Sequence, residues 1–264
     1  MIKFLIFCLL IYVLIASVLY FSQRRVTFNK SGIPKKPEDY GLNYVNEEYV
    51  EVSKNIKLLN WYSPPKNNKP IIVYFHGNSF DIGERSFWIK NYIDQGSGVL
   101  LNAYRGYSGN SGNPTEENLY KDSKKILSWL KDKLLIDEKK IILYGESLGT
   151  GVVVELAQNI NYKAVILEAP FTSVTEVAQK MYPIFPVKYL IWDKFDNLSK
   201  INNLSSPILF LHGKKDEIVP FEMGLKLYQN YNNKKMNVFI DEAMHNNLYE
   251  YGIANKVIEF INKH

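Results

Sequence analysis

Short apolar runs that alternate with helix-like stretches are the feature that most restricts how this chain can fold. Six such runs hold four or five residues each and are rich in β-branched, leucine and aromatic side chains. Runs of this length and continuity are typical of strands buried on both faces of a sheet. They lie at residues 71–75, 99–103, 141–144, 164–167, 208–211 and 236–240. The sequence therefore predicts an α/β fold with a mostly parallel central sheet.

The segments around these runs complete the predicted fold. Residues 49–53 and 56–62 alternate between apolar and polar side chains, which predicts an antiparallel pair of strands at the start of the sheet. Between and after the apolar runs, stretches that we predict to be helices flanking the sheet lie at about 83–95, 115–134, 148–158, 221–231 and 246–262. Thr115 followed by Glu116 and Glu117 indicates an N-cap with acidic residues in the first turn.

One connection is longer than a crossover helix requires. About forty residues separate the runs at 164–167 and 208–211, and they include Tyr182, Phe185 and Trp192 with prolines at 183 and 186. We interpret this segment as a small cap insertion, about residues 172–200, that lines an apolar pocket. The alternative is a crossover whose aromatic side chains pack on the sheet.

The N-terminus carries a segment long enough to cross a membrane. Eighteen residues from Phe4 to Phe21 contain no charge, and a helix of that length spans about 27 Å. Arg24 and Arg25 follow. We predict a retained single-pass anchor at residues 1–23, a linker at 24–41 and a folded domain at 42–264. A cleaved signal peptide is the alternative. The Lys and Arg residues after the segment favour a domain on the cytoplasmic face of the membrane.

The charge distribution argues against nucleic-acid binding. The net charge of +5 comes from residues 1–36, which hold six basic residues and no acidic one. The rest of the chain has 26 basic and 27 acidic residues, whereas a nucleic-acid-binding domain concentrates positive charge in its folded body. The single cysteine, Cys8, lies in the predicted anchor, which excludes an intrachain disulfide, a cysteine–zinc cluster and a cysteine nucleophile in the domain.

A candidate nucleophile lies directly after the run at 141–144. Gly145-Glu146-Ser147-Leu148-Gly149 has the GxSxG pattern and precedes a helix-like stretch. In a strand–GxSxG–helix arrangement the turn is so tight that flanking side chains would clash, and it exposes the serine at the carboxyl end of the sheet. Ser147 is therefore the predicted nucleophile. The backbone N–H of Leu148, at the helix start, is a predicted oxyanion donor.

A serine nucleophile needs a base and a group that orients the base. Among the four histidines we choose His245, in a polar loop after the last strand; His76 and His212 each end a strand, and His264 is the terminal residue. Asp216 follows the run at 208–211 and is the predicted acid. The chain order Ser, Asp, His is the order in α/β-hydrolases. Glu168 and Asp241 are the alternative acids.

The second oxyanion donor is expected from the strand next to the nucleophile. The run at 71–75 continues into His76-Gly77-Asn78-Ser79, so the backbone N–H of Asn78 is the candidate, with Ser79 as the alternative. The chain has neither a GxxxxGK[ST] phosphate loop nor an HExxH zinc motif. We therefore expect no cofactor and no metal.

With these residues in place the chain resembles the α/β-hydrolases, and within them the Bem46-like membrane-anchored serine hydrolases. The similarity covers roughly residues 42–262. It rests on the blocks HGNSFDIGER (76–85), NAYRGYSGNSG (102–112), PTEENLYKD (114–122), ILYGESLGTG (142–151), ILEAPFTSV (166–174), LHGKKDEIVP (211–220) and MHNNLYE (244–250). The resemblance implies that Ser147, Asp216 and His245 form a catalytic triad, with Asn78 and Leu148 in the oxyanion hole.

The predicted function is a membrane-tethered serine hydrolase that cleaves a carboxylic ester or thioester, or an amide, through an acyl-enzyme. Its partners would be a small-molecule or lipid-like acyl substrate and the membrane, with no nucleic acid. Two alternatives remain open. One is a membrane-tethered scaffold that keeps the hydrolase fold without turnover, and the other is an acyltransferase that uses the same triad.

Overall fold

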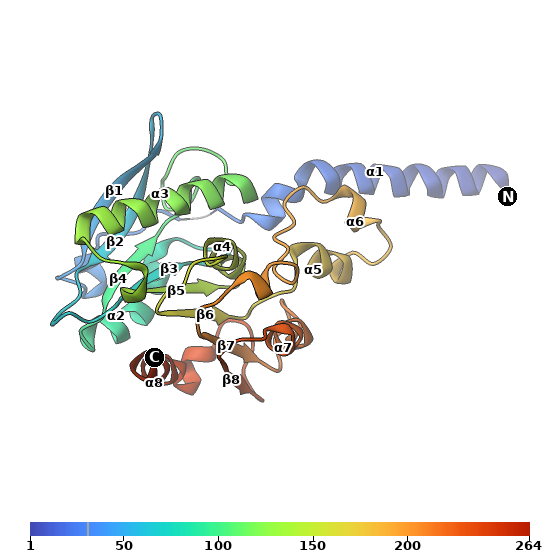
Figure 1. Ribbon diagram of the computed structural model, residues 1–264. Helices are drawn as coiled ribbons and strands as arrows, with labels where there is room; N and C mark the ends of the chain where they lie inside the picture. Colours follow the sequence, from blue (N-terminus) through green and yellow to red (C-terminus); the bar gives the residue numbers. More distant parts are fainter. Residues whose placement is uncertain (31) are drawn as a thin grey trace.

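A central sheet organises the protein. The computed structural model describes residues 1–30 and 32–264. Within these residues eight strands form one sheet in the order β1-β2-β4-β3-β5-β6-β7-β8 (Figure 1). The strands from β4 to β8 are parallel to one another, and β1 and β2 are antiparallel to their neighbours. The strands are β1 Asn46–Ser53, β2 Ile56–Ser63, β3 Ile71–Phe75, β4 Gly98–Asn102, β5 Ile141–Glu146, β6 Ala164–Glu168, β7 Ile208–Gly213 and β8 Lys235–Ile240.

This arrangement confirms the predicted mostly parallel sheet with an antiparallel pair at its start. Strands β3 to β7 are buried at every position, as their unbroken apolar runs predict. The prediction of full burial is wrong for β8, where every residue is only partly buried. The reason is its place at the edge of the sheet, where β7 is its single neighbour.

Helices cover both faces of the sheet, and the core has two layers. Leu119 of α3, Val152 of α4 and Leu227 of α7 pack in one apolar cluster, whereas Ile89 of α2 and Val257 of α8 pack in the cluster on the other face. These helices are α2 Ser86–Asp94, α3 Glu116–Leu134, α4 Leu148–Leu156, α7 Phe221–Asn230 and α8 Ile253–Lys263. Short 3-10 helices are η1 Pro37–Tyr40, η2 Ile82–Arg85, η3 Glu138–Lys140, η4 Ile201–Asn203 and η5 Leu248–Tyr251.

The helix boundaries follow local signals in most places. The Thr115 hydroxyl accepts a hydrogen bond from the Asn118 N–H at 3.1 Å, which is the expected N-cap of α3. The predicted C-terminal helix at 246–262 begins later than expected, because a 3-10 turn and Gly252 precede the first residue of α8, Ile253.

The N-terminal helix is longer than the expected anchor and is joined to the domain. Helix α1, Ile2–Thr27, projects from the body in Figure 1 and continues past residue 23. Among the described residues it is the one helix that is long and apolar enough to cross a membrane, by length and composition. In the segment expected as a linker, Phe28 is buried in the core and Asn29 forms a β-bridge with Ser79. The domain therefore begins to pack before residue 42.

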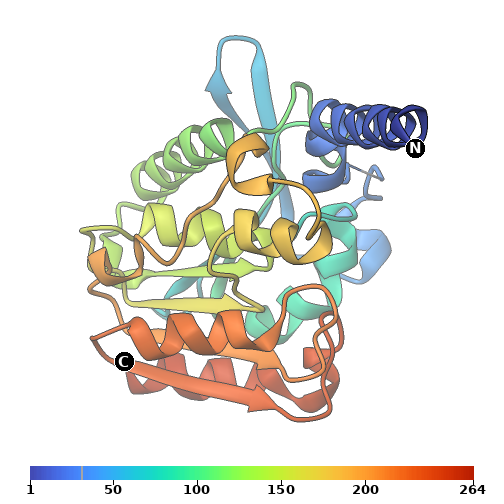
Figure 2. The same cartoon turned by 90° about the vertical axis from the view of Figure 1, so that its right-hand side faces the viewer.

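The connection between β6 and β7 contains two helices. They are α5, Val174–Met181, and α6, Val187–Leu190, and they lie where the cap insertion is expected. In both Figure 1 and Figure 2 this segment lies beside α1. The cap follows the carboxyl end of β6, so it lies on the side of the sheet where ligands bind in open α/β folds.

Candidate active site

The tight turn between β5 and α4 carries Ser147. Its backbone has φ +49° and ψ −112°, a conformation that a non-glycine residue adopts only under strain. The two glycines around it are required by space. A Cβ at Gly145 would lie 2.6 Å from the Gly149 carbonyl oxygen, and a Cβ at Gly149 would lie 2.0 Å from the Phe75 carbonyl oxygen. The turn predicted from GxSxG is therefore present, and the glycines are there for the reason predicted.

The structure brings Ser147, His245 and Asp216 together. The Ser147 hydroxyl lies 3.1 Å from His245 Nε2, and His245 Nδ1 lies 2.7 Å from Asp216 Oδ2. Because the Asp216 carboxylate accepts a hydrogen bond from Nδ1–H, Nε2 is left as the acceptor for the serine hydroxyl. Three side chains separated by up to 98 positions in the sequence thus form one continuous hydrogen-bonded line.

Asp216 is held as a carboxylate by several donors. Oδ1 accepts the backbone N–H groups of Ile218 at 2.9 Å and Val219 at 2.8 Å. Oδ2 lies 3.2 Å from His212 Nε2, in addition to its contact with His245. Burial alone would raise the pKa of Asp216, but the hydrogen bonds from His212 and His245 hold it well below its usual range. The acid is therefore charged and fixed in orientation at neutral pH.

The two backbone N–H groups predicted as oxyanion donors belong to Leu148 and Asn78. Leu148 is the first residue of α4, so its N–H lies outside the helical hydrogen-bond ladder. The loop that follows β3 approaches the serine closely, since a Cβ at Gly77 would lie 3.5 Å from Ser147 Cβ. Within residues 1–30 and 32–264, no acceptor is assigned to the N–H of Asn78 in this loop. Its carbonyl accepts the Tyr107 hydroxyl at 3.0 Å, which fixes the loop.

A buried ion pair joins the two sides of this site. Arg85, at the end of η2, donates to both carboxylate oxygens of Glu146, with Nη2–Oε1 at 2.7 Å and Nε–Oε2 at 3.1 Å. Its Nη1 donates to the Ser79 carbonyl at 2.8 Å. Burial would raise the pKa of Glu146, but the Arg85 guanidinium keeps it below its ordinary value. Arg85 thus connects the residue before Ser147 to the residue after Asn78.

The alternative acids occupy other environments. Glu168 is buried, and its Oε2 accepts the Tyr144 hydroxyl at 2.5 Å, while its backbone carbonyl accepts the Ser147 N–H at 2.8 Å. Burial, and then the charge of Glu146, raises the pKa of Glu168 to about 8. Asp241 is 75 % exposed and pairs with Lys214 at 2.6 Å. The imidazole of His245 therefore has Asp216 as its carboxylate partner.

The other histidines have structural surroundings, with one exception. His76 is fully buried, its Nδ1 lies 2.7 Å from the Gly77 carbonyl, and burial lowers its pKa to about 3. His264 packs against Phe260, with ring centroids 4.7 Å apart. His212 contacts Asp216, which the sequence analysis did not predict. His212 lies four residues before Asp216 in LHGKKD, and this proximity in sequence was the available signal.

Arg85 and Tyr107 are supporting residues that sequence reasoning also missed. Both lie in blocks that carried the resemblance, HGNSFDIGER and NAYRGYSGNSG, but neither block indicates a contact 61 or 29 positions away. No periodic or capping pattern reports such a partner, so only the three-dimensional arrangement identifies them.

Comparison with known proteins gives relatives at the level of sequence and of fold. The prolyl oligopeptidase family matches residues 105–247. An uncharacterised protein of Mycobacterium tuberculosis is 31 % identical over 88 % of this chain and 83 % of its own length. Human alpha/beta hydrolase domain-containing protein 17B is 36 % identical over 70 % of this chain and 64 % of its own length.

The solved structures that share the fold include an esterase and an alpha-beta hydrolase. The Pyrococcus furiosus esterase Pf2001 has a TM-score of 0.73 at 17 % identity and covers 89 % of this chain and 97 % of that one. An alpha-beta hydrolase from Vibrio vulnificus has a TM-score of 0.70 at 20 % identity, covering 91 % and 90 %. Together with the strand order, the sequence relatives show that this chain belongs to the α/β-hydrolase superfamily.

Proposed function

We propose that the protein is a membrane-tethered serine hydrolase that cleaves a carboxylic ester or thioester through Ser147, His245 and Asp216. The observation that supports this most strongly is the hydrogen-bonded line from the Ser147 hydroxyl through the imidazole to the carboxylate, with distances of 3.1 and 2.7 Å. These distances lie within the range that proton transfer requires. The hydrolase relatives support the same reaction class.

The reaction begins with attack of Ser147 Oγ on the acyl carbonyl carbon. His245 Nε2 takes the hydroxyl proton, and Asp216 stabilises the imidazolium without taking the proton itself. The negative charge that develops on the carbonyl oxygen is stabilised by the N–H groups of Asn78 and Leu148. His245 then gives its proton to the departing alcohol or thiol, which leaves an acyl-enzyme.

The second half of the reaction releases the acyl group. His245 removes a proton from water, the resulting hydroxide adds to the acyl-enzyme, and the carboxylic acid leaves as Ser147 recovers its proton. Helix α1 would keep the enzyme at a membrane, where lipid-like acyl compounds are available. An acceptor other than water at this step would make the protein an acyltransferase.

Labelling with a fluorophosphonate probe tests the proposal. We expect the full-length chain to be labelled and Ser147→Ala not to be labelled, because the probe reacts with an activated serine hydroxyl. Ser199→Ala is the matched control, since Ser199 is an exposed serine outside the site and its removal should leave labelling intact. A parent chain that resists labelling would contradict catalysis and favour the scaffold alternative.

Hydrolysis of p-nitrophenyl esters of increasing chain length tests the substrate class. We expect esters with long acyl chains to be turned over faster than acetyl esters, because the substrate is proposed to be lipid-like. An equal rate for acetyl and long acyl esters would contradict this part of the proposal. Added alcohol acceptors that yield transfer products in place of free acid would identify an acyltransferase.

A further inference from the structure

Helix α1 is bound to the cap by specific contacts. The ring of Tyr12 stacks on Phe185 with centroids 5.0 Å apart, and its hydroxyl donates to the Ile184 carbonyl at 3.0 Å. Eleven residues further along α1, the Gln23 amide donates to the Leu190 carbonyl at 3.2 Å. These contacts extend over three turns of α1. The cap is therefore packed along α1 from Tyr12 to Gln23.

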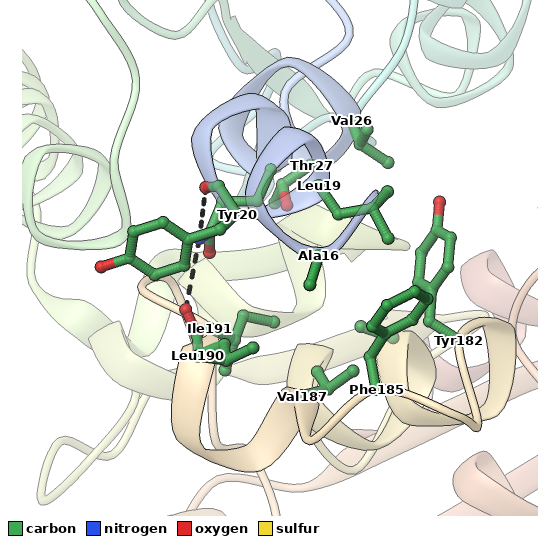
Figure 3. Close-up of a pocket in the computed structure, with 12 residues that line it drawn as sticks. Ala16, Leu19, Tyr20, Val26, Thr27, Tyr182, Phe185, Val187, Leu190 and Ile191 are labelled. Carbon is green, nitrogen blue, oxygen red and sulfur yellow. Dashed lines mark hydrogen bonds between the residues drawn. The ribbon is translucent and has the colours of Figure 1, made fainter. Parts of the chain in front are cut away.

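Residues 181–192, which we name the cap tip, present an apolar surface beside α1. Met181, Ile184, Tyr189 and Trp192 are 58, 71, 83 and 40 % exposed. The cap tip and α1 together line an open groove of about 90 Å³ whose walls are largely apolar (Figure 3). Exposed apolar side chains gathered in one patch mark an interaction site on a soluble surface. Helix α1 is likewise apolar and exposed, with Leu14 64 % and Val18 58 % exposed.

The charges around the cap tip fit a membrane surface. Between Glu176 and Asp193 the sequence has no acidic residue, and its charged side chains are Lys180 and Lys188. The Arg24 guanidinium lies 5.0 Å from the ring centroid of Trp192. An apolar patch with tryptophan, tyrosine and basic side chains at its border is the composition of a segment that lies in the interface of a bilayer.

The position of the cap tip along α1 determines how deep it would lie. Tyr12 is nine residues before Phe21, the end of the uncharged run, which corresponds to about 14 Å along the helix. One leaflet of the hydrocarbon core is about 15 Å thick. Because Ile184 is hydrogen-bonded to Tyr12, insertion of the uncharged run with this contact intact brings Ile184 into the hydrocarbon as well.

The backbone of the cap tip is also suited to an apolar environment, where each unpaired polar group is costly. Pro183 and Pro186 have no N–H group. Side chains of α1 satisfy two cap-tip carbonyls through Tyr12 and Gln23, and Gln23 Oε1 also accepts the Trp192 N–H at 2.8 Å. These backbone groups, which would hydrogen-bond to water in an exposed loop, are instead paired with side chains of α1.

We infer that the cap tip is inserted into the membrane leaflet beside α1 from Tyr12 onward, with bilayer lipid as its partner. The inference rests on the membrane tether of the proposed function and does not depend on catalysis. It places Ile184 inside the hydrocarbon, and the Trp192–Arg24 contact at the headgroups. The cap would then be a second membrane contact in addition to the helix.

Fluorescent labels on single cysteines test this placement in the full-length chain. In a Cys8→Ala background, an environment-sensitive label is attached at Ile184→Cys or Tyr189→Cys, and the protein is reconstituted in vesicles of phosphatidylcholine and phosphatidylglycerol that contain doxyl-labelled lipid. Leu14→Cys, on exposed α1, reports the tether. The matched control is Leu135→Cys, an apolar residue 90 % exposed at the C-terminal end of α3, whereas the N-terminal end of α3 is the one that contacts Asp193.

We expect lipid quenching and a blue-shifted emission at 184 and 189 comparable to those at 14, with neither change at 135. Quenching at 14 alone would overturn the inference and leave the tether standing. No quenching at 14 would overturn both the tether and the inference. Labels at 184 and 189 that are shielded from aqueous iodide but not quenched by lipid would show that a second copy of the chain covers the cap tip, which also overturns it.

Discussion

The Arg85–Glu146 ion pair offers the sharpest test of how the site is supported. Its side chains are 4 and 11 % exposed, and two parallel hydrogen bonds join them. Arg85→Met keeps much of the apolar stem and removes the charge, so Glu146 is left as a buried carboxylate without its cation. Breaking a buried pair on one side costs about 3–5 kcal/mol of unfolding free energy. For a domain of this size that corresponds to a Tm lower by roughly 10 °C.

The double variant Arg85→Met with Glu146→Gln separates stability from position. Removing both charges of a buried pair is often close to neutral, so we expect most of the lost stability to return. The tether from Arg85 to the Ser79 carbonyl is still absent, and the loop that carries Asn78 can move away from Ser147. A displacement of about 1 Å near reacting atoms costs about 10²-fold in rate. We therefore expect kcat about 10²-fold lower with KM near the parental value.

Thermal unfolding and p-nitrophenyl ester kinetics of the purified full-length chain in detergent measure the two effects. Lys90→Met on α2 is the matched control, because the Lys90–Asp94 pair is exposed and contributes little. A double variant with parental kcat would refute the positioning of the Asn78 loop by Arg85. A single variant with parental Tm would refute the argument from the buried charge.

Three further changes give separate tests. Asp216→Asn should lower kcat by about 10³–10⁴-fold through loss of the correct imidazole tautomer, whereas Asp241→Asn, on the surface, should leave kcat near the parental value in the same ester assay. Glu168 has a folded pKa of about 8, above its ordinary value, so its stabilising contribution is full at acidic pH and is lost as the pH rises through 8. The Tm of Glu168→Gln relative to the parent should therefore increase from pH 5 to pH 8, and a constant difference would contradict the raised pKa. Gly149→Ala should lower Tm strongly or prevent folding, because its Cβ would lie 2.0 Å from the Phe75 carbonyl oxygen, and a normal Tm would show that the turn can relax.

The sequence predicted those parts of the protein that local rules control. An unbroken apolar run predicts a buried strand, and the run at 71–75 is β3 to the residue. The GxSxG turn is set by steric limits within five residues, so Ser147 could be placed before any tertiary contact was known. Parallel strands end at one edge of the sheet, which brings Asp216 and His245 to the same rim as the serine.

What the sequence did not predict depends on contacts between distant segments. The edge position of β8 follows from strand order, and its apolar run does not differ from that of a central strand. The contact between Tyr12 and Ile184 joins positions 172 residues apart. The uncharged run was interpreted as an anchor separated from the domain by a linker, because hydropathy reports the length of an apolar segment but not its partner. Arg85 was missed because no local sequence pattern indicates its partner Glu146, which lies 61 positions away.

The cap links the proposed membrane contact to the candidate active site over a short path. The Ser147 N–H is hydrogen-bonded to the Glu168 carbonyl at the end of β6, and the cap begins with α5 only a few residues later, where the Ser173 hydroxyl accepts the Glu176 N–H. A cap tip inserted in the leaflet would therefore fix the height of the sheet edge above the bilayer. An acyl compound could reach Ser147 while part of its chain stays in lipid. Only its carbonyl end would then have to leave the headgroup layer. On this argument, loosening the contact of Gln23 with Leu190 should affect long acyl esters in vesicles more than acetyl esters in solution, because only the former depend on that height.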